Sequence, residues 1–173
     1  MTTFQINKHI EIDEGFQGCN LTEFSIAAEN TITDEQLVDT FIHSKHFTYD
    51  SLRDSIKREP NKGYLGQAFN IEKVGIHDFK KCDKTTTTKF LIDFLNEPNW
   101  GSDRDDFEKL LDKYFRFHEL FKDREFYILS KNWFDIKDEK LLEPQSWCYT
   151  YYFIIIYLDR VVKQLTLTEW TYD

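Results

Sequence analysis

Residues 146–158 read SWCYTYYFIIIYL and contain no acidic or basic side chain. A helix that spans a bilayer needs about 20 consecutive apolar residues, whereas this run of thirteen is interrupted at Asp159 and Arg160. Most of its side chains are aromatic or β-branched, the types that pack best on a pleated sheet. The stretch therefore predicts a central strand buried on both faces rather than a membrane segment.

A second strand is predicted directly after this run, in VVKQLTLTEW at 161–170. The two strands are joined at Asp159-Arg160, so together they predict a C-terminal β-hairpin. Val162, Leu165 and Leu167 do not lie on one strict alternation, which predicts a bulge near Lys163.

The N-terminal residues also alternate with period 2. FQINKHIEI, at 4–12, predicts a short strand in which Phe4 and Ile6 are in phase with Ile10 and Ile12. The following EGFQG, at 14–18, predicts a turn.

Two short helices are predicted next. Thr33 and Gln36 have the spacing of a capping box, and the apolar residues that follow predict a helix from about 34 to 45. A second capped pattern, TYDSLRDSIKREP, predicts a helix that ends before Pro60. Residues 61–84 are compatible with either a strand or an irregular crossover.

The middle of the chain returns to helical periodicity. TTTTKFLIDFLNEPNW has a helical apolar stripe closed by Pro98. The strongest helix is predicted from about 103 to 122, with Ser102 as its cap and with acids in the first turn, where the macrodipole favours them. The side chains expected on its buried face are Phe107, Leu110, Leu111, Tyr114, Phe115, His118 and Phe121. EFYILS, at 125–130, then predicts a compact strand.

These elements indicate an α+β fold: an antiparallel sheet that ends in a C-terminal β-hairpin and packs against several helices. The chain has 173 residues and no linker-like stretch, so a single globular domain over 1–173 is expected.

The charge balance points to the class of partner. The net charge is −9, and the acidic excess is greatest in residues 1–60. Such a field repels phosphate backbones and attracts basic surfaces. The sequence therefore argues against direct nucleic-acid binding and predicts a basic protein partner.

Cysteine spacing and the N-terminus indicate the compartment. Cys19, Cys82 and Cys148 are widely spaced, which fits neither a disulfide framework nor a paired metal-ligand motif. The first residues, MTTFQINKHIEIDEG, lack the basic region and apolar core of a secretory signal. A cytoplasmic protein with free thiols and no membrane association is expected.

Three patterns could carry chemistry, and each has a simpler structural interpretation. His43 and His46 could offer two imidazoles to a metal, but no carboxylate or thiol completes a ligand set nearby, and histidine is favoured at a helix C-terminus. A nuclease-like metal cluster can be imagined in SDRDDFE, formed by Asp103, Asp105, Asp106 and Glu108, although helix capping explains the same residues. Flanking lysines could activate Cys82, or it could be an incidental surface thiol.

Nucleophile elbow, P-loop, dinucleotide-binding and HExxH motifs are all absent from the sequence. We therefore expect no catalytic residues, no metal ligands and no cofactor, and a protein that is not an enzyme. Two alternatives stay open: a small metal-dependent hydrolase that uses His43 and His46, and an α+β small-ligand-binding domain with a pocket lined by Phe and Tyr.

The four tryptophans divide by context. Trp147 and Trp170 lie in the predicted terminal hairpin, where core or cross-strand packing is expected. Trp100 and Trp133 lie in polar connections, EPNWGSD and SKNWFDI, where an aromatic ringed by charge is typical of an interface anchor or caps a helix end.

In its length, acidity, terminal hairpin YTYYFIIIYLDRVVKQLTLTEW and lack of catalytic motifs, the chain resembles the bacterial immunity proteins that neutralise polymorphic toxins, including those of contact-dependent inhibition systems. This resemblance implies a protein that binds a cognate toxin domain, often a basic nuclease, and blocks its active site or a neighbouring surface. It rests on general character, so it assigns no residue a role.

The predicted contact surface is the anionic N-terminal region, with loop tryptophans as apolar anchors. Its residues are Glu11, Asp13, Glu14, Glu23, Glu29, Asp34, Glu35 and Asp39, together with Trp100 or Trp133. For each acid the alternative is a solvated face that keeps the protein soluble.

Overall fold

The computed structural model describes residues 2–29, 31–47, 64–65, 69–70, 73–97, 103–117, 125–130 and 151–172. Its elements are β1 (Thr3–Glu14), β2 (Gln17–Ala27), α1 (Asp34–Ile42), β3 (Tyr64–Leu65), β4 (Phe69–Asn70), the 3₁₀ turn η1 (Ile76–Asp78), β5 (Lys80–Cys82), α3 (Lys84–Leu95), α4 (Arg104–Phe117), β6 (Phe126–Ser130), β7 (Tyr151–Asp159) and β8 (Gln164–Tyr172).

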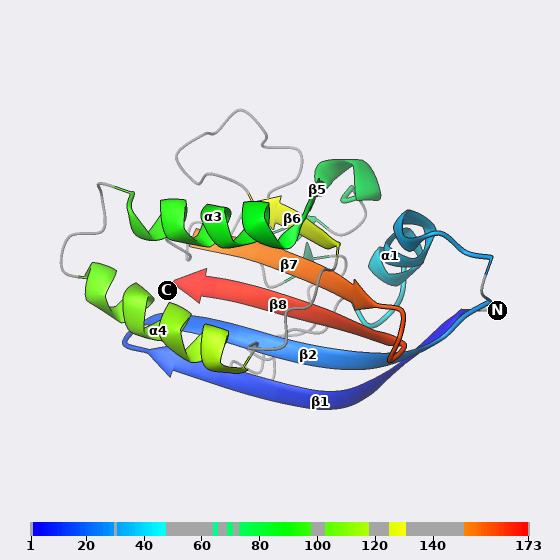
Figure 1. Ribbon diagram of the computed structural model, residues 1–173, viewed down its shortest axis with the longest axis horizontal. Coiled ribbons are helices and arrows are strands. Elements are labelled where there is room, and N and C mark those ends of the chain that lie inside the picture. Colours follow the sequence, from blue (N-terminus) through cyan, green and yellow to red (C-terminus); the bar gives the residue numbers. More distant parts are fainter. Residues whose placement is uncertain are drawn as a thin grey trace.

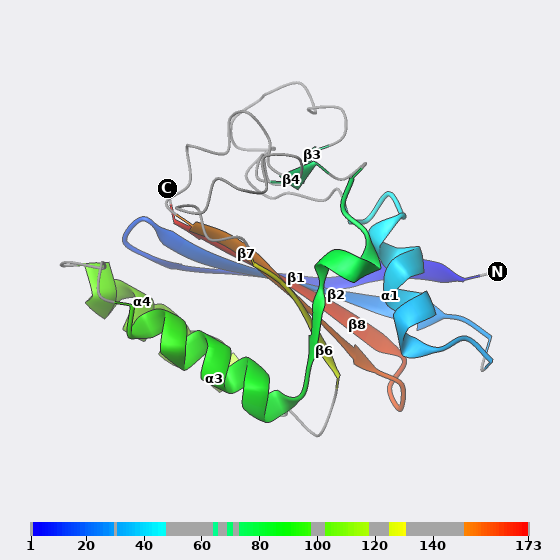
Figure 2. The same ribbon diagram turned by 90° about the horizontal axis from the view of Figure 1, so that it is seen from above.

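Six strands form one antiparallel sheet in the order β1-β2-β8-β7-β6-β5 (Figure 1), and β3 pairs separately with β4. Helices α3 and α4 cover one face of this sheet, whereas α1 packs on the other (Figure 2). The predicted α+β fold, with its antiparallel sheet, packed helices and C-terminal hairpin, is confirmed.

Strand β7 lies in the middle of the sheet, and all of its residues are buried. Alternate side chains supply the two cores: Tyr152 and Ile154 belong to the cluster on the α1 face, whereas Phe153 and Ile155 belong to the cluster under α3 and α4. Residues 151–158 of the strand predicted from SWCYTYYFIIIYL are thus buried on both faces, as expected, whereas residues 146–150 lie outside the described residues.

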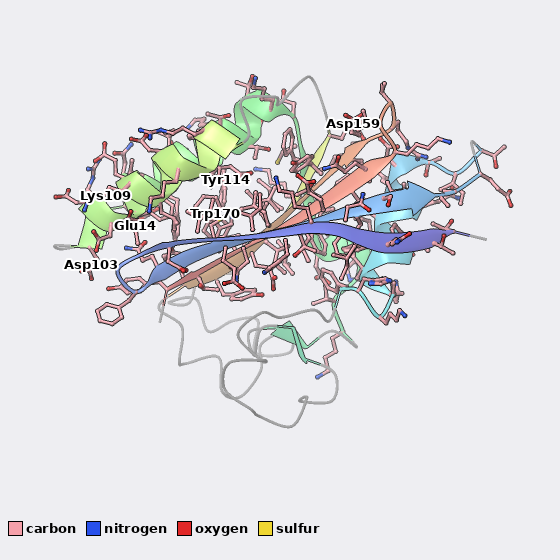
Figure 3. All side chains as sticks on the ribbon, turned by 90° about the horizontal axis from the view of Figure 1, so that it is seen from below. Glu14, Asp103, Lys109, Tyr114, Asp159 and Trp170 are labelled. Atoms are coloured by element: carbon pink, nitrogen blue, oxygen red, sulfur yellow. The ribbon has the colours of Figure 1, made fainter. Side chains whose placement is uncertain are left out.

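The connection between β7 and β8 is longer than predicted. Asp159 pairs with Gln164, so residues 160–163 form the turn, and the strand register continues without a shift. The expected bulge near Lys163 is therefore wrong: Val162 is 62% exposed in the turn and does not belong to the strand alternation. The Asp159 carboxylate (Figure 3) holds this turn by accepting hydrogen bonds from the backbone N–H groups of Val161 and Val162.

Strand β1 contains an irregularity that the sequence pattern hid. Its register against β2 shifts between Ile6 and Lys8. One extra residue reverses the side-chain alternation, so Phe4 joins the core on the α1 face while Ile12 joins the core under α4. The expectation that Phe4 and Ile6 are in phase with Ile10 and Ile12 is therefore wrong. Strand β2 was not predicted at all.

Helix α1 begins at the predicted capping box. The Thr33 hydroxyl accepts a hydrogen bond from the Gln36 N–H, and the Gln36 side chain accepts one from the Thr33 N–H. The helix ends at Ile42, shorter than predicted, with His43 as its C-cap. The second helix predicted in TYDSLRDSIKREP lies outside the described residues.

Helices α3 and α4 occupy the predicted segments. An Asp83 cap precedes α3, accepting a hydrogen bond from Thr86 N–H at 2.7 Å. Helix α4 buries Phe107, Leu110, Leu111 and Tyr114 as expected, and Phe115 is partly buried. Ser102, His118 and Phe121 lie outside the described residues. No helix within the described ranges is both long and apolar enough to span a membrane.

Candidate protein-binding surface

The predicted acidic residues fall into two groups at opposite ends of the β1–β2 hairpin. Glu11, Asp13 and Glu14 lie near its turn, whereas Glu29, Asp34, Glu35 and Asp39 lie near the start of β1 and on α1. Glu23 lies between the groups on β2. At about 3.4 Å per strand residue, the groups are roughly 30 Å apart. The sequence therefore predicted one surface where the structure has two.

The group near the turn is enlarged by the start of α4. The turn packs against this helix: a Cβ built on Gly15 would lie 2.6 Å from the Asp106 carboxylate. Glu14, Asp103 and Lys109 lie at the same end of the molecule (Figure 3). We call this surface the acidic end and define it as Asp13, Glu14, Phe16, Asp103, Asp105 and Asp106.

Two lysines of α4 pair with carboxylates of the acidic end, and one of them, Lys113, binds the hairpin turn. Lys113 forms an ion pair with Glu14 and donates a hydrogen bond to the Asp13 carbonyl at 3.1 Å. Lys109 pairs with Asp106 at 3.1 Å, and this hydrogen bond raises the pKa of Lys109 above its usual value. Carboxylates from the hairpin and from the helix are thus fixed in one arrangement.

Asp103 ties the acidic end to the last strand. The Tyr172 hydroxyl donates to the Asp103 carboxylate, and this bond raises the pKa of Tyr172 to about 12. The Gln17 side chain donates to the Asp103 carbonyl at 2.8 Å and accepts from the buried Tyr151 hydroxyl at 3.0 Å. These bonds connect the start of α4 to β2, β7 and β8, so the surface rests on the rigid sheet.

Phe16 is the residue that the sequence analysis missed. It lies at the tip of the β1–β2 turn and is 79% exposed. Hairpin turns favour Gly, Asn, Asp and Ser, so an exposed phenylalanine there is the signal that could have found it. An aromatic ring beside carboxylates has the composition of an interface anchor with a polar rim.

In the group near α1, Asp34 and Asp39 have partners within the protein. Asp34 accepts from Arg160 Nε at 2.5 Å, and Arg160 also donates to the Ile32 carbonyl at 2.7 Å. This contact joins the start of α1 to the β7–β8 turn. Asp39 lies 3.6 Å from His43, and Glu35 is exposed.

The tryptophan predictions have different outcomes. Trp100, Trp133 and Trp147 lie outside the described residues. Trp170 is fully buried and packs against the rings of Tyr114 and Phe153, with centroid distances of 4.7 and 5.4 Å. The packing role predicted for Trp170 is confirmed.

The two histidines of the metal hypothesis have separate environments. The His43 imidazole contacts the Asp39 carbonyl at 2.8 Å, whereas His46 packs edge-on against Phe24 at 5.6 Å. Burial lowers the pKa of His46. Among the described residues, no group of three or more His, Cys, Asp or Glu side chains is placed to hold a metal ion.

The described cysteines are not activated. Cys82 is 7% exposed, and burial raises its pKa despite the opposing effect of Lys80. Cys19 is fully buried, and burial raises its pKa as well. Because the thiolate is the nucleophilic form, the hypothesis of a reactive Cys82 is corrected.

Two of the depressions lined by described residues have volumes of several hundred Å³. One of about 470 Å³ lies between β1 and α4 and is lined by Glu11, Ile12, Asp13, Lys113 and Arg116. Another of about 450 Å³ lies beside β5 and α3 and is lined by Asp78, Lys80, Cys82, Thr86, Lys89, Phe90, Asp93, Ile128 and Ser130. Both linings mix charged side chains with apolar ones.

The comparisons with known proteins add no family to this description. No protein-family model matches the chain, and neither the curated proteins nor the solved structures contain a significant match.

Proposed function

We propose that the protein is a binding inhibitor, an immunity protein that neutralises a cognate basic toxin domain, and that the acidic end is its contact surface. The observation that supports this proposal is Phe16, a 79% exposed aromatic side chain in the hairpin turn, next to Gly15, whose Cβ position lies against the Asp106 carboxylate of α4. Large apolar side chains are not needed for folding at a turn, so its exposure is best explained by a partner.

The two components of this surface have different tasks. The carboxylates attract a basic partner and orient it, which mainly raises the association rate. Phe16 enters a pocket of the partner and is desolvated there, which mainly slows dissociation. If the partner is a nuclease, Asp13 and Asp105 occupy cationic positions that would otherwise hold nucleic-acid phosphates.

The first test is co-expression with the product of the gene immediately upstream. We expect that product to be toxic alone, to form a stable one-to-one complex with this protein, and to lose its toxicity in the complex. A harmless neighbour, together with no basic protein retained by this protein at low salt, contradicts the proposal.

The second test locates the surface with matched variants. Phe16→Ser should weaken the complex by about 30-fold, as at an interface hot spot, while changing the free energy of unfolding by less than about 0.5 kcal/mol. The double variant Asp13→Lys/Asp105→Lys should lower the association rate constant by about tenfold or more at low salt. Surface plasmon resonance measures both effects.

Glu35→Lys is the matched control, because this exposed residue lies on α1 at the other end of the hairpin. It should change the association rate by less than about twofold. If Glu35→Lys is as damaging as the substitutions at the acidic end, only the overall charge matters and the assignment of the surface is wrong.

A further inference from the structure

The depression of about 450 Å³ beside β5 and α3 lies away from the acidic end. Strand β5 is at one edge of the main sheet, whereas the β1–β2 hairpin is at the other. Helix α3 contacts both β5 and β6 and forms one wall of the depression (Figure 1). Small-molecule sites have volumes of roughly 300 to 1,000 Å³. The depression therefore has the size of a site for one small ligand.

The floor of the depression is apolar. Cys82 of β5 and Ile128 of β6 are buried side chains of the core under α3. Phe90 of α3 is partly buried, and its ring packs edge-on against Phe153 with centroids 5.2 Å apart. A free thiol behaves as a small apolar group, and aromatic rings favour edge-on or offset contacts with other rings. This floor fits a flat aromatic body.

Both carboxylates of the lining are engaged within the protein. Asp93 forms an ion pair with Lys89 one turn away on α3. The Asp78 carboxylate accepts a hydrogen bond from the Gly75 N–H at 2.9 Å and lies 3.5 Å from His77. The Asp78 side chain is only 15% exposed, so it serves its own 3₁₀ turn.

Lys80 is the charged residue of the lining that differs. It is exposed, and it forms no ion pair with any residue in the described part of the chain. Lys80 and Cys82 are two apart in β5, so both side chains point to the α3 face. Burial raises the pKa of Cys82, and the Lys80 charge opposes this effect, which places the ammonium group near the floor. Ser130 of β6 adds an exposed hydroxyl. Both groups can donate hydrogen bonds to an anion.

We propose that this depression binds a small aromatic carboxylate, with its rings over Cys82, Phe90 and Ile128 and its carboxylate paired with Lys80. Lys80 sets the sign of the ligand, because an ammonium ligand would meet only carboxylates that are already engaged in the described lining. The site is separate from the acidic end. It is therefore tested on the isolated protein, and its failure does not affect the proposed inhibitor function.

Two probes that share their rings but differ in charge test the chemistry of the ligand. Isothermal titration calorimetry should give a dissociation constant on the order of 100 µM for naphthoate. Naphthylmethylamine should bind at least about tenfold more weakly, because it cannot accept the charge-assisted hydrogen bond from Lys80. Absence of naphthoate binding at millimolar concentrations, or equal binding of the two probes, overturns the inference.

Two variants test whether naphthoate occupies this depression. Lys80→Met removes the charge while keeping a long side chain, so it should weaken naphthoate binding about tenfold. Ser130→Trp places an indole in the depression and should abolish binding, because the ligand needs that space. Both residues are exposed, so the circular dichroism melts should change little.

Lys8→Met is the matched control, because Lys8 is an exposed lysine of β1, at the other edge of the sheet. It should change the dissociation constant of naphthoate by less than about twofold, because charges farther away than a Debye length are largely screened. Naphthoate binding that persists in Ser130→Trp contradicts this location. A loss in Lys8→Met equal to that in Lys80→Met would mean that only the overall charge matters, which also overturns the assignment.

Discussion

The central strand β7 and the outer strand β1 belong to the same antiparallel sheet, yet they contain opposite kinds of residue. Every residue of β7 is buried, whereas only Phe4 and Ile12 are buried in β1. A central strand has helices or other elements on both faces, so apolar side chains are favoured at every position. An edge strand meets water, so charged side chains are accepted there. Stability should therefore depend on the centre of the sheet, and recognition on its edge.

One polar residue in the centre supports this distinction. Glu169 of β8 is 2% exposed, and its carboxylate accepts a hydrogen bond from the Tyr152 hydroxyl at 2.6 Å. Burying a charged group is costly unless it is hydrogen-bonded. The centre thus accepts a carboxylate only with a partner, whereas β1 exposes Glu11 and Asp13 to solvent.

The largest effect is expected for Ile155→Ala in β7. Ile155 is fully buried between the sheet and α3 and α4, so the truncation should lower the free energy of unfolding by about 2 to 5 kcal/mol. Ile6→Ala in β1 is the matched control: Ile6 is 41% exposed and should cost less than about 1 kcal/mol. Urea denaturation measures both losses of stability. Equal losses would contradict the expected difference between the centre and the edge of the sheet.

An intermediate effect is expected for Gly15→Ala in the turn of the edge hairpin. Gly15 has φ +59°, a left-handed conformation that costs other residues about 1 to 2 kcal/mol, and a methyl group there would also displace the Asp106 carboxylate. Gly15→Asn should cost less, because asparagine enters the left-handed region more readily. Thermal melts compare the two variants. If alanine is no worse than asparagine, backbone conformation is not what this position requires.

The smallest effect is expected for Tyr172→Phe, which removes the bond between β8 and Asp103. This substitution should cost about 1 kcal/mol near neutral pH. The pKa of Tyr172 is raised to about 12, so the neutral phenol is favoured in the folded state. Its contribution is complete below the unfolded pKa of about 10 and is lost as the pH rises toward 12.

The stability difference between wild type and Tyr172→Phe should therefore be constant below about pH 10 and shrink above it. Other tyrosines titrate in both proteins, so their contributions cancel in the difference. A difference that persists unchanged at pH 12 would mean that the Tyr172 hydroxyl bond does not titrate.

The sequence predicted the parts of the fold that local rules control. The Thr33 capping box, the apolar face of α4 and the strand that includes Ile155 all depend on periodicity or on neighbouring residues. The bulge before Lys8 was hidden, because apolar residues recur two apart on both sides of it, Phe4 and Ile6 before it and Ile10 and Ile12 after it. The start of β8 was also misplaced, at residue 161 instead of Gln164, since an Asp159 side chain that binds turn N–H groups is visible only in three dimensions.

The candidate site was less predictable than the fold. Glu14 and Asp106 are distant in sequence and become neighbours only because the β1–β2 turn packs on the start of α4. Asp34 had the right charge, but Arg160 from the β7–β8 turn makes it a structural residue. Phe16 could have been found from the sequence, because a phenylalanine is unusual in a predicted turn.

By itself the sequence determined an acidic chain, its helical and extended segments, and an apolar run too short to form a membrane-spanning helix, because these properties follow from composition and local periodicity. The tertiary structure decided which carboxylates share a surface and which are paired with lysines, and it placed β1 at an edge of the described sheet. Those features depend on contacts between residues far apart in the chain, which no local pattern encodes.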